Sequence, residues 1–454
     1  MEYFEIMKEY EVAEKLFEIE KELNLFDKKI QNIYFWKVIR FDIYLAILIK
    51  LNLLSVNHKE RQYVEKFLRV VRIIKNSFYY SSSNKKVNSI ILENPRKVKD
   101  ECGNYYDLYT KYLIENLQKE EIKIEVIDLG LNGNHYEKED SIRKFGDSFY
   151  FDIICRLFFK IKGFNQKEQL IIEKLNFKLN SVFNIKIDLN KIIVNNLTTF
   201  HLSYKKFYSL FKNKENKELY LVCSYGKEGI IKAAQDLEIK VIELQHGAMN
   251  KYHVGYSFDS YTKIPYFPDE MQLFGKFWSD ITPIPISDNS LKYIGFEDLN
   301  RKLKFYRGIK KINKLVFLSQ WTVNDELFEK AVEVAKVYTT YQIVFRLHPA
   351  NNNIKDSFLS LIKEKNILNL KLSDLDDPLQ RELSDAKYVV GVYSTAIYEA
   401  LSFNCEIILL DLYGIEQMEF LINNNLATKI KKNQQINLEN VRSKNIVSKY
   451  FFGG

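Results

Sequence analysis

Apolar residues change their spacing along the chain, and this change predicts where helices and strands lie. Over residues 1–80 they recur three and four apart among frequent Glu and Lys, as at Ile19, Leu23 and Phe26, which is typical of amphipathic helices. From residue 87 onward, short β-branched runs alternate with helical patterns. Such alternation predicts parallel sheets covered by helices, as in α/β proteins.

The region that follows the N-terminal helices predicts a first sheet. Its strand candidates are residues 87–92, 122–127, 219–223, 239–244 and 292–295, and its helix candidates are residues 105–117 and 228–237. Residues 140–214 are rich in aromatic side chains, and we expect a helix there only around 166–175. The pattern is that of β-α-β units in a parallel sheet.

The second half of the chain predicts a second sheet with six strands, at residues 314–318, 342–347, 368–372, 388–392, 406–410 and 427–430. Most of these strands are separated by a helical pattern, as in a Rossmann-like unit. A chain of 454 residues is long enough for two hydrophobic cores. We therefore expect a helical N-terminal region (1–80), an α/β domain (81–298) and a second α/β domain (299–454).

Two strand ends of the second sheet lead into polar turns. Strand 342–347 runs into Arg346-Leu347-His348-Pro349, and it should end there because proline cannot donate a ladder hydrogen bond. Strand 388–392 runs into Ser394-Thr395 at the start of a predicted helix, whose N–H groups and dipole favour a phosphate or carboxylate. Glu399, one turn further, could accept hydrogen bonds from a ribose. A strand terminator and a helix N-cap are the purely structural alternatives.

A third polar turn follows strand 239–244. Gln245-His246-Gly247 exposes one imidazole on a loop that glycine allows to approach a ligand closely. Histidine can accept a proton near neutral pH, so His246 is a candidate catalytic base. The alternative is that His246 has only a structural role. The neighbouring polar and aromatic residues are candidates for the lining of a cleft, namely Gln245, Gly247 and the loop from Tyr252 and His253 to Tyr256.

Charge and composition limit the classes of function. The net charge is +8, and residues 61–86 concentrate Lys and Arg among aromatic side chains. This patch could meet an anionic membrane surface, a nucleic acid or an acidic polymer, or be a solvated helix face. Residues 34–54 are apolar but contain Lys37, Arg40 and Asp42, which predicts a buried or interfacial amphipathic helix and not a membrane span.

Motifs for cofactors and metals are not found in the sequence. It has neither the glycine-rich dinucleotide fingerprint nor a P-loop, and its four cysteines are widely scattered. Asp374, Asp376 and Asp377 could bind a metal, but Asp377-Pro378 also suits the start of a helix. We therefore expect no cofactor and no metal site. Without a signal peptide, the protein is expected in the cytoplasm.

Taken together, the three turns resemble a known family. Three motifs are similar in order and spacing to those of the metal-independent glycosyltransferases of the GT-B fold that build bacterial capsule and lipopolysaccharide. They are Glu243-Leu244-Gln245-His246-Gly247, Arg346-Leu347-His348-Pro349, and Ser394-Thr395 with Glu399 and Ala400-Leu401. This family includes sialyltransferases, Kdo transferases and the polyol-phosphate polymerases of teichoic acid synthesis. The resemblance covers roughly residues 220–415 and implies a GT-B-like α/β fold, with two facing Rossmann-like domains.

The resemblance also implies a reaction and its partners. The reaction is the transfer of a sugar from a nucleotide-activated donor to an acceptor. The donor is a nucleotide sugar, with CMP-sugar favoured, and the acceptor is a glycan or a glycolipid. His348, Ser394 and Thr395, with Arg346 and Pro349 beside them, would lie at the donor phosphate. Glu399 would lie at the ribose, and His246 at the reacting centre. The sequence lacks the Asp/Glu-Asp/Glu-Gly motif of the sialyltransferases and the His-Gly-Thr motif of the polymerases, so the donor class stays open.

Other functions stay open beside this one. They are a CDP-polyol phosphotransferase, a nucleotide-sugar epimerase of the same fold, and a non-catalytic partner of a polysaccharide assembly complex. The basic N-terminal region also allows a peripheral association with the cytoplasmic face of the inner membrane. Only charge points to a nucleic acid, so we expect none as a partner.

Overall fold

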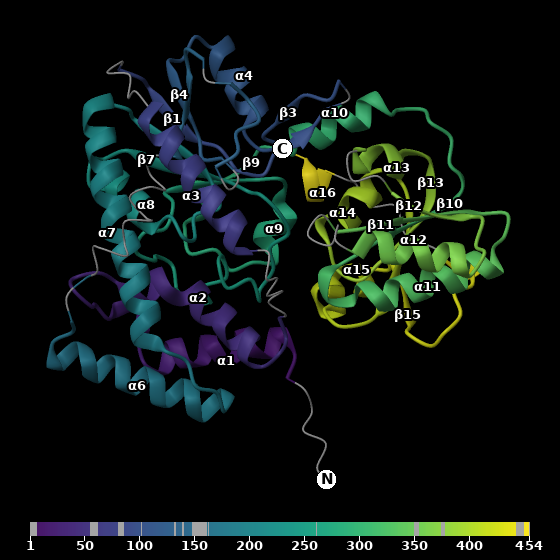
Figure 1. Cartoon of the computed structure of the whole chain (residues 1–454), viewed down its shortest axis with the longest axis horizontal. Helices are drawn as coiled ribbons and strands as arrows, with labels where there is room; N and C mark the ends of the chain where they lie inside the picture. Colours follow the sequence, from purple (N-terminus) through teal and green to yellow (C-terminus); the bar gives the residue numbers. More distant parts are fainter. Residues whose placement is uncertain are drawn as a thin grey trace. The chain divides into compact units, whose positions relative to one another are not determined.

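The computed structural model divides the chain into two compact units. Unit 1 comprises Met1–Val98, Tyr105–Leu273 and Trp278–Tyr293, and unit 2 comprises Lys99–Asn104, Phe274–Phe277 and Ile294–Gly454. Each unit contains a parallel sheet with helices packed on it (Figure 1). The residues that the structure describes are 7–54, 62–79, 86–100, 102–130, 133–138, 140–147, 161, 163–259, 261–348, 354–373, 377–441 and 449–453.

Unit 1 is built on a seven-stranded sheet in the order β5-β4-β1-β6-β7-β8-β9. All neighbouring strands are parallel. The strands are β1 (Ser89–Leu92), β4 (Ile124–Asp128), β5 (Arg143–Phe145), β6 (Glu218–Val222), β7 (Lys240–Leu244), β8 (Glu270–Leu273) and β9 (Leu291–Tyr293). The five strands predicted for this region are thus confirmed, while β5 and β8 were not identified as separate strands.

Both faces of this sheet are apolar because successive side chains of a strand point to opposite sides. Ile90 and Leu92 of β1 pack in a core with helices α7 (Leu189–Lys214) and α8 (Glu228–Gln235). Ile91 packs in a second core with α4 (Lys111–Lys119). The continuous burial of β1 and β4 is the expected pattern for a parallel sheet covered on both faces.

The N-terminal region of unit 1 is helical, as predicted. It contains α1 (Glu9–Glu22), α2 (Phe35–Lys50) and α3 (Gln62–Tyr79), and α2 packs against α1 and α7. Lys37 and Arg40 of α2 are buried in ion pairs with Glu228 and Glu20. The predicted amphipathic helix is therefore a buried one. Among the described residues, no helix combines the length and the apolar character that a membrane crossing needs.

The aromatic region 140–214 contains more structure than its sequence predicts. The expected helix around 166–175 is the first half of α6 (Gln166–Phe183), and α7 follows with 26 residues. Asn165 and Asp188 cap these helices by accepting hydrogen bonds from backbone N–H groups. The helix predicted for 105–117 is shorter, because Tyr105–Tyr106 forms the short strand β3 and α4 starts only at Lys111.

Unit 2 is built on a six-stranded parallel sheet in the order β12-β11-β10-β13-β14-β15. All six predicted strands are confirmed, as β10 (Ile312–Leu318), β11 (Gln342–Arg346), β12 (Leu370–Leu372), β13 (Ala386–Gly391), β14 (Glu406–Asp411) and β15 (Thr428–Lys431). Figure 1 shows this sheet and its helices in green and yellow. The α/β fold class, with two Rossmann-like units and an N-terminal helical part, is thus confirmed.

Helices cover both faces of the second sheet. On one face, Phe345 of β11 meets Phe328 of α11 (Asn324–Val337) and Phe358 of α12 (Lys355–Glu364). On the other face, Arg346 reaches Glu382 of α13 (Leu379–Asp385), and α14 (Thr395–Ser402) packs beside α13. The unit also includes α10 (Glu297–Phe305), α15 (Glu419–Asn423) and the C-terminal α16 (Lys449–Phe452).

Candidate functional site

Each sheet has a point at which the order of its strands reverses. In unit 1 the chain moves outward from β1 to β4 and β5, then returns to place β6 on the other side of β1. In unit 2 the same reversal occurs between β10 and β13. Open α/β sheets bind ligands in the crevice outside the carboxyl ends of the strands at this point. The loops at these two edges are therefore where functional side chains are expected.

The predicted phosphate-binding residues of unit 2 lie at one edge of the sheet. His348 follows β11 after one residue and is half-buried, and Ser394 and Thr395 follow β13. Only β10 separates these two strands, so the two loops leave the sheet about 10 Å apart at the usual strand spacing. Both loops thus flank the reversal point. Pro349 lies outside the described residues.

Ser394 is the N-cap of α14. Its backbone is extended, with φ −174° and ψ 147°, and its Oγ accepts a hydrogen bond from the N–H of Ala396 at 3.2 Å. The hydroxyl proton can then be donated to another group. Thr395 begins the helix beside it. The first amides of the helix and the serine hydroxyl together suit an anion.

Gln320 also lies at this edge, and sequence reasoning missed it. It comes two residues after β10, and its side-chain amide donates a hydrogen bond to the carbonyl of Tyr393. Thr322 and the Tyr393 hydroxyl are hydrogen-bonded at 2.7 Å. These bonds fix the turn that precedes Ser394. The signal in the sequence was a polar residue two positions after a buried strand.

Arg346 is held by partners within unit 2. Its guanidinium donates hydrogen bonds to Ser373 Oγ and to the carbonyl of Asp377, both at 2.9 Å, and lies 3.5 Å from Glu382 Oε2. These contacts join β11 to the segment after β12 and to α13. Arg346 thus has a clear structural role, and a contact with phosphate stays a prediction.

Glu399 lies on the buried side of α14. It is 9% exposed, and its Oε2 accepts a hydrogen bond from Gln380 Nε2 at 2.7 Å. Burial raises the pKa of Glu399 from 4.5 to about 7, and the nearby Asp298 adds to this effect. A ribose would have to compete with Gln380 for this carboxylate. Binding of a ribose by Glu399 stays a prediction.

The raised pKa of Glu399 predicts a dependence of stability on pH. A carboxyl group whose pKa is higher in the folded protein favours folding when it is protonated, and this contribution is lost as the pH rises from about 4.5 through about 7. We expect Glu399→Gln to be about as stable as the wild type near pH 4 and more stable than the wild type at pH 8, by at most about 3 kcal/mol. Urea unfolding of the full chain at both pH values measures this difference.

The control for this measurement is Glu364→Gln, because Glu364 is exposed at the end of α12. Its effect on the free energy of unfolding should be small, because the side chain is exposed at the surface. If Glu399→Gln behaves like this control, the Glu399 carboxyl is not held in its protonated form.

His246 lies at the carboxyl edge of the sheet in unit 1, two residues after β7. Its Nδ1 is 3.1 Å from the hydroxyl of Tyr256, and its Nε2 is 3.4 Å from the hydroxyl of Tyr225. The hydroxyl of Tyr109 donates to the backbone carbonyl of His246 at 2.6 Å. His246 is thus surrounded by tyrosines from the segments that follow β3, β6 and β7.

Tyr256 joins His246 to a buried carboxylate. Its hydroxyl donates a hydrogen bond to Glu243 Oε1 at 2.5 Å, and the same oxygen accepts one from the backbone N–H of Ser224 at 2.9 Å. Glu243 is fully buried within β7. The result is a chain of hydrogen bonds from a buried carboxylate through a phenol to an imidazole. Sequence reasoning missed Tyr225 as part of this site, as well as the hydrogen bonds that join Tyr256 to Glu243 and to His246.

Burial shifts the titration of these groups. It lowers the pKa of His246 to about 3, and the nearby His253 and Lys227 act in the same direction. His246 is therefore neutral at pH 7, as a proton acceptor must be. Burial raises the pKa of Glu243, although the hydrogen bonds from Tyr256 and Ser224 oppose this shift. Burial and Glu243 raise the pKa of Tyr256, which keeps its proton.

The other predicted cleft residues lie near His246 and have partners within unit 1. Gln245 is buried and donates a hydrogen bond from Nε2 to the carbonyl of Gly247 at 2.8 Å. His253 Nδ1 accepts one from the N–H of Gly255, and its ring lies 4.9 Å from that of Tyr256. Tyr252 contacts Tyr10 of α1. These residues shape the loop, and their contact with a ligand stays a prediction.

A second titratable cluster lies at the ends of β1, β4 and β5. His135 bridges Asp128 and Asp147, and Lys97 pairs with Glu93 at 2.6 Å. Burial disfavours the charged form of His135, but hydrogen bonds to the two aspartates prevail and raise its pKa to about 9. His135 is therefore protonated at pH 7 and is not suited to act as a base. We interpret this cluster as a structural tie between strands.

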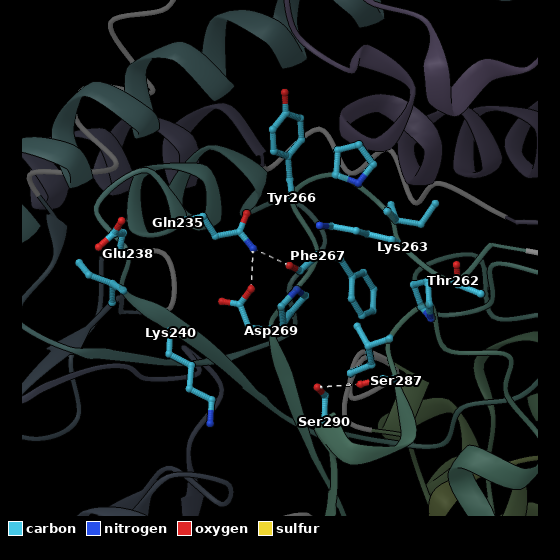
Figure 2. Close-up of a pocket in the computed structure, with 16 residues that line it drawn as sticks. Gln235, Glu238, Lys240, Thr262, Lys263, Tyr266, Phe267, Asp269, Ser287 and Ser290 are labelled. Atoms are coloured by element: carbon cyan, nitrogen blue, oxygen red, sulfur yellow. Dashed lines mark hydrogen bonds between the residues drawn. The ribbon is translucent and has the colours of Figure 1, made fainter.

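A pocket of about 690 Å³ opens at the opposite edge of the same sheet (Figure 2). Lys240, Asp269 and Ser290 lie at the starts of β7, β8 and β9 and line it. Figure 2 shows Gln235 donating hydrogen bonds to Phe267 and Asp269, with Ser287 and Ser290 in contact. None of the predicted site residues lines this pocket.

Comparison with known proteins gives a distant likeness of fold. Neither a protein-family model nor a curated protein sequence matches this chain. Among solved structures, UDP-GlcNAc 2-epimerase of Methanocaldococcus jannaschii, in complex with UDP-GlcNAc and UDP, is 13% identical with a TM-score of 0.44, covering 80% of this chain and 96% of that one.

Two further solved structures are similar to the same extent. UDP-GlcNAc 2-epimerase of Neisseria meningitidis is 13% identical with a TM-score of 0.45, covering 76% of this chain and 88% of that one. MurG of Acinetobacter baumannii is 10% identical with a TM-score of 0.43, covering 76% and 86%. Similarity this low does not assign a reaction or a substrate to this chain.

Proposed function

We propose that this protein transfers a sugar from a nucleotide-activated donor to a carbohydrate acceptor. The observation that carries the proposal is the placement of His348 and Ser394 on two loops that flank the reversal point of the sheet in unit 2. Ser394 also caps α14, whose leading amides favour negative charge. In unit 1, His246 supplies a neutral imidazole at the corresponding edge of its sheet.

The roles of these residues follow from their chemistry. When the bond between the sugar and the phosphate breaks, its electron pair leaves with the nucleotide. Ser394, the first amides of α14 and His348 would stabilise the charge that develops on the phosphate oxygens. The acceptor hydroxyl gives its proton to His246 Nε2 while its oxygen bonds to the anomeric carbon. The bond from the sugar to the phosphate is thus replaced by a bond from the sugar to the acceptor oxygen, and the acceptor proton is held by His246.

An epimerase acting on a nucleotide sugar is the main alternative. It would use the same phosphate-binding edge in unit 2 but would need no acceptor. Incubation of the protein with the donor alone distinguishes the two, since only an epimerase would convert the sugar. The capsule or lipopolysaccharide acceptor, the CMP base and the peripheral binding to a membrane stay predictions from the sequence.

Nucleotide binding gives a direct test of the donor site. We expect one of CMP, CDP, UDP, GDP and ADP to stabilise the protein by about 2.7 kcal/mol at 100 times its Kd, which corresponds to roughly 5–10 °C in Tm for a unit of this size. His348→Ala and Ser394→Ala should each abolish most of this shift, because they remove groups that contact the phosphate. Thermal unfolding with each nucleotide measures it.

Loss of the Ser394 cap also destabilises a helix by about 1 kcal/mol, so the test needs a matched control. Asp188→Ala provides it, because Asp188 caps α7 in unit 1 by accepting from the N–H of Lys191 at 3.0 Å. This variant should lose similar stability and keep the full nucleotide shift. Wild-type shifts in both His348→Ala and Ser394→Ala would remove the phosphate assignment.

A further inference from the structure

The hydrogen bonds around His246 determine which of its nitrogens carries the proton. Neutral imidazole has one N–H donor and one acceptor nitrogen, and the partner of one nitrogen fixes the other. Here Nδ1 faces the hydroxyl of Tyr256 at 3.1 Å, and Nε2 lies on the side of Tyr225. The direction of the hydrogen bond between His246 and Tyr256 therefore decides which nitrogen can accept a proton.

The hydroxyl of Tyr256 has a single proton and a closer partner than His246. It lies 2.5 Å from Glu243 Oε1, against 3.1 Å from His246 Nδ1. Glu243 Oε1 already accepts the N–H of Ser224, so it acts as the acceptor oxygen of the carboxyl group. The phenol proton is thus directed to Glu243, whether or not the other carboxyl oxygen is protonated. The phenol oxygen is left to accept a hydrogen bond from His246.

We propose that Glu243 and Tyr256 are positioning residues that hold the proton of His246 on Nδ1 and so leave Nε2 as the proton acceptor. This inference deepens the proposed function, on which its catalytic meaning rests, but the tautomer itself can be measured without any substrate. The sequence places Glu243 at the start of the motif that contains His246 and places Tyr256 in the predicted cleft segment, but it indicates neither their hydrogen bond nor a positioning role.

The same arrangement supports the imidazolium that would form in the reaction. As the acceptor hydroxyl loses its proton, the O–H bond breaks and an N–H bond forms at Nε2. The positive charge of the imidazolium is then stabilised by the hydrogen bond from Nδ1–H to the hydroxyl oxygen of Tyr256. The hydroxyl proton of Tyr256 points at Glu243. Neither positioning residue gives up an atom. Such support matters here, because burial disfavours the imidazolium and lowers the pKa of His246 to about 3.

Direct observation of the ring nitrogens tests the proposal. The full chain is labelled with ¹⁵N-histidine, and the His246 signals are assigned by their loss in His246→Asn. At pH 7 we expect a protonated Nδ1 and an unprotonated Nε2 in the wild type. Tyr256→Phe removes the acceptor for the Nδ1 proton and should abolish the preference for a single tautomer.

Variants of Glu243 separate positioning from simple packing. Glu243→Gln keeps an oxygen that can accept from both Ser224 and Tyr256, so it should preserve the tautomer. Glu243→Leu, of similar size, cannot accept and should lose it. Tyr225→Phe is the matched control for Tyr256→Phe, because it removes a hydroxyl on the Nε2 side and should leave Nδ1 protonated. Unchanged signals of His135 and His201 would show that each variant is folded.

Two outcomes would overturn the proposal. One is a wild-type spectrum with the proton on Nε2, and the other is a retained Nδ1 proton in both Tyr256→Phe and Glu243→Leu. Failure of the proposed function would give a different experimental result. In that case the spectra agree with the proposal, while the wild-type protein transfers no sugar from a nucleotide-activated donor to an acceptor.

Discussion

Replacement of His246 by Asn is expected to lower kcat for sugar transfer by roughly 10²–10⁴-fold, the usual contribution of a positioned general base. The donor KM should change little, because His246 is assigned to the acceptor hydroxyl. Stability should fall by only about 1 kcal/mol, since Tyr256 keeps its hydrogen bond to Glu243. Steady-state kinetics with varied donor and acceptor, together with thermal unfolding, measure these effects.

The pH profile adds a second readout for His246. An ordinary histidine would cause kcat/KM to fall below about pH 6.5 as it becomes protonated. Burial lowers the pKa of His246 to about 3, so the imidazole stays neutral and no loss between pH 8 and pH 5 should depend on it. A His246→Asn variant that retains more than about a tenth of the wild-type kcat would contradict its role as the base.

Replacement of Glu20 by Ala is expected to destabilise unit 1 by about 3–5 kcal/mol, because it leaves the buried charge of Arg40 without its partner. Glu20 accepts hydrogen bonds from Arg40 Nε at 2.5 Å and Nη2 at 2.9 Å, and another from Trp36 Nε1. Both charged side chains are almost fully buried. Urea unfolding of the full chain, followed by a signal from unit 1, measures the loss.

The neighbouring residue provides the control for Glu20→Ala. Lys21 pairs with Asp259 at 2.6 Å, but both side chains are largely exposed. Lys21→Ala should therefore change the free energy of unfolding by less than about 1 kcal/mol. Equal effects of the two substitutions would show that burial of the Glu20–Arg40 pair has no energetic consequence.

This ion pair also bears on the site. Arg40 donates hydrogen bonds to the carbonyls of Val254 and Ser257, which bracket Tyr256 in the chain. The N-terminal helices thus hold the segment that presents Tyr256 to Glu243 and His246. A partial loss of activity in Glu20→Ala, beyond the loss of folded protein, would follow from this link.

The sheets were predictable because their strands are continuous apolar runs bounded by polar turns, as in β13 with Ser394 after it. His348 and His246 could be located as candidate site residues because each lies in a polar turn at the end of such a strand. The partners of His246 were not predictable. Tyr256 returns to Glu243 through an irregular loop, and no spacing rule indicates which of 30 tyrosines does so.

The charged residues of α2 illustrate another limit. In the sequence, Lys37 and Arg40 interrupt an apolar segment and weigh against a membrane span, but they give no partner. The structure supplies Glu228 and Glu20, which lie far away in the chain or on another helix. Buried charges require partners, yet only the tertiary fold determines which carboxylates serve.

The path of the chain between the units constrains how the protein can be dissected. Lys99–Asn104 and Phe274–Phe277 belong to unit 2, although the sequence on both sides of each belongs to unit 1. No single proteolytic cut would therefore release either unit whole, and no continuous gene fragment encodes either one completely. Separate expression of the two would require grafted peptides or complementing fragments.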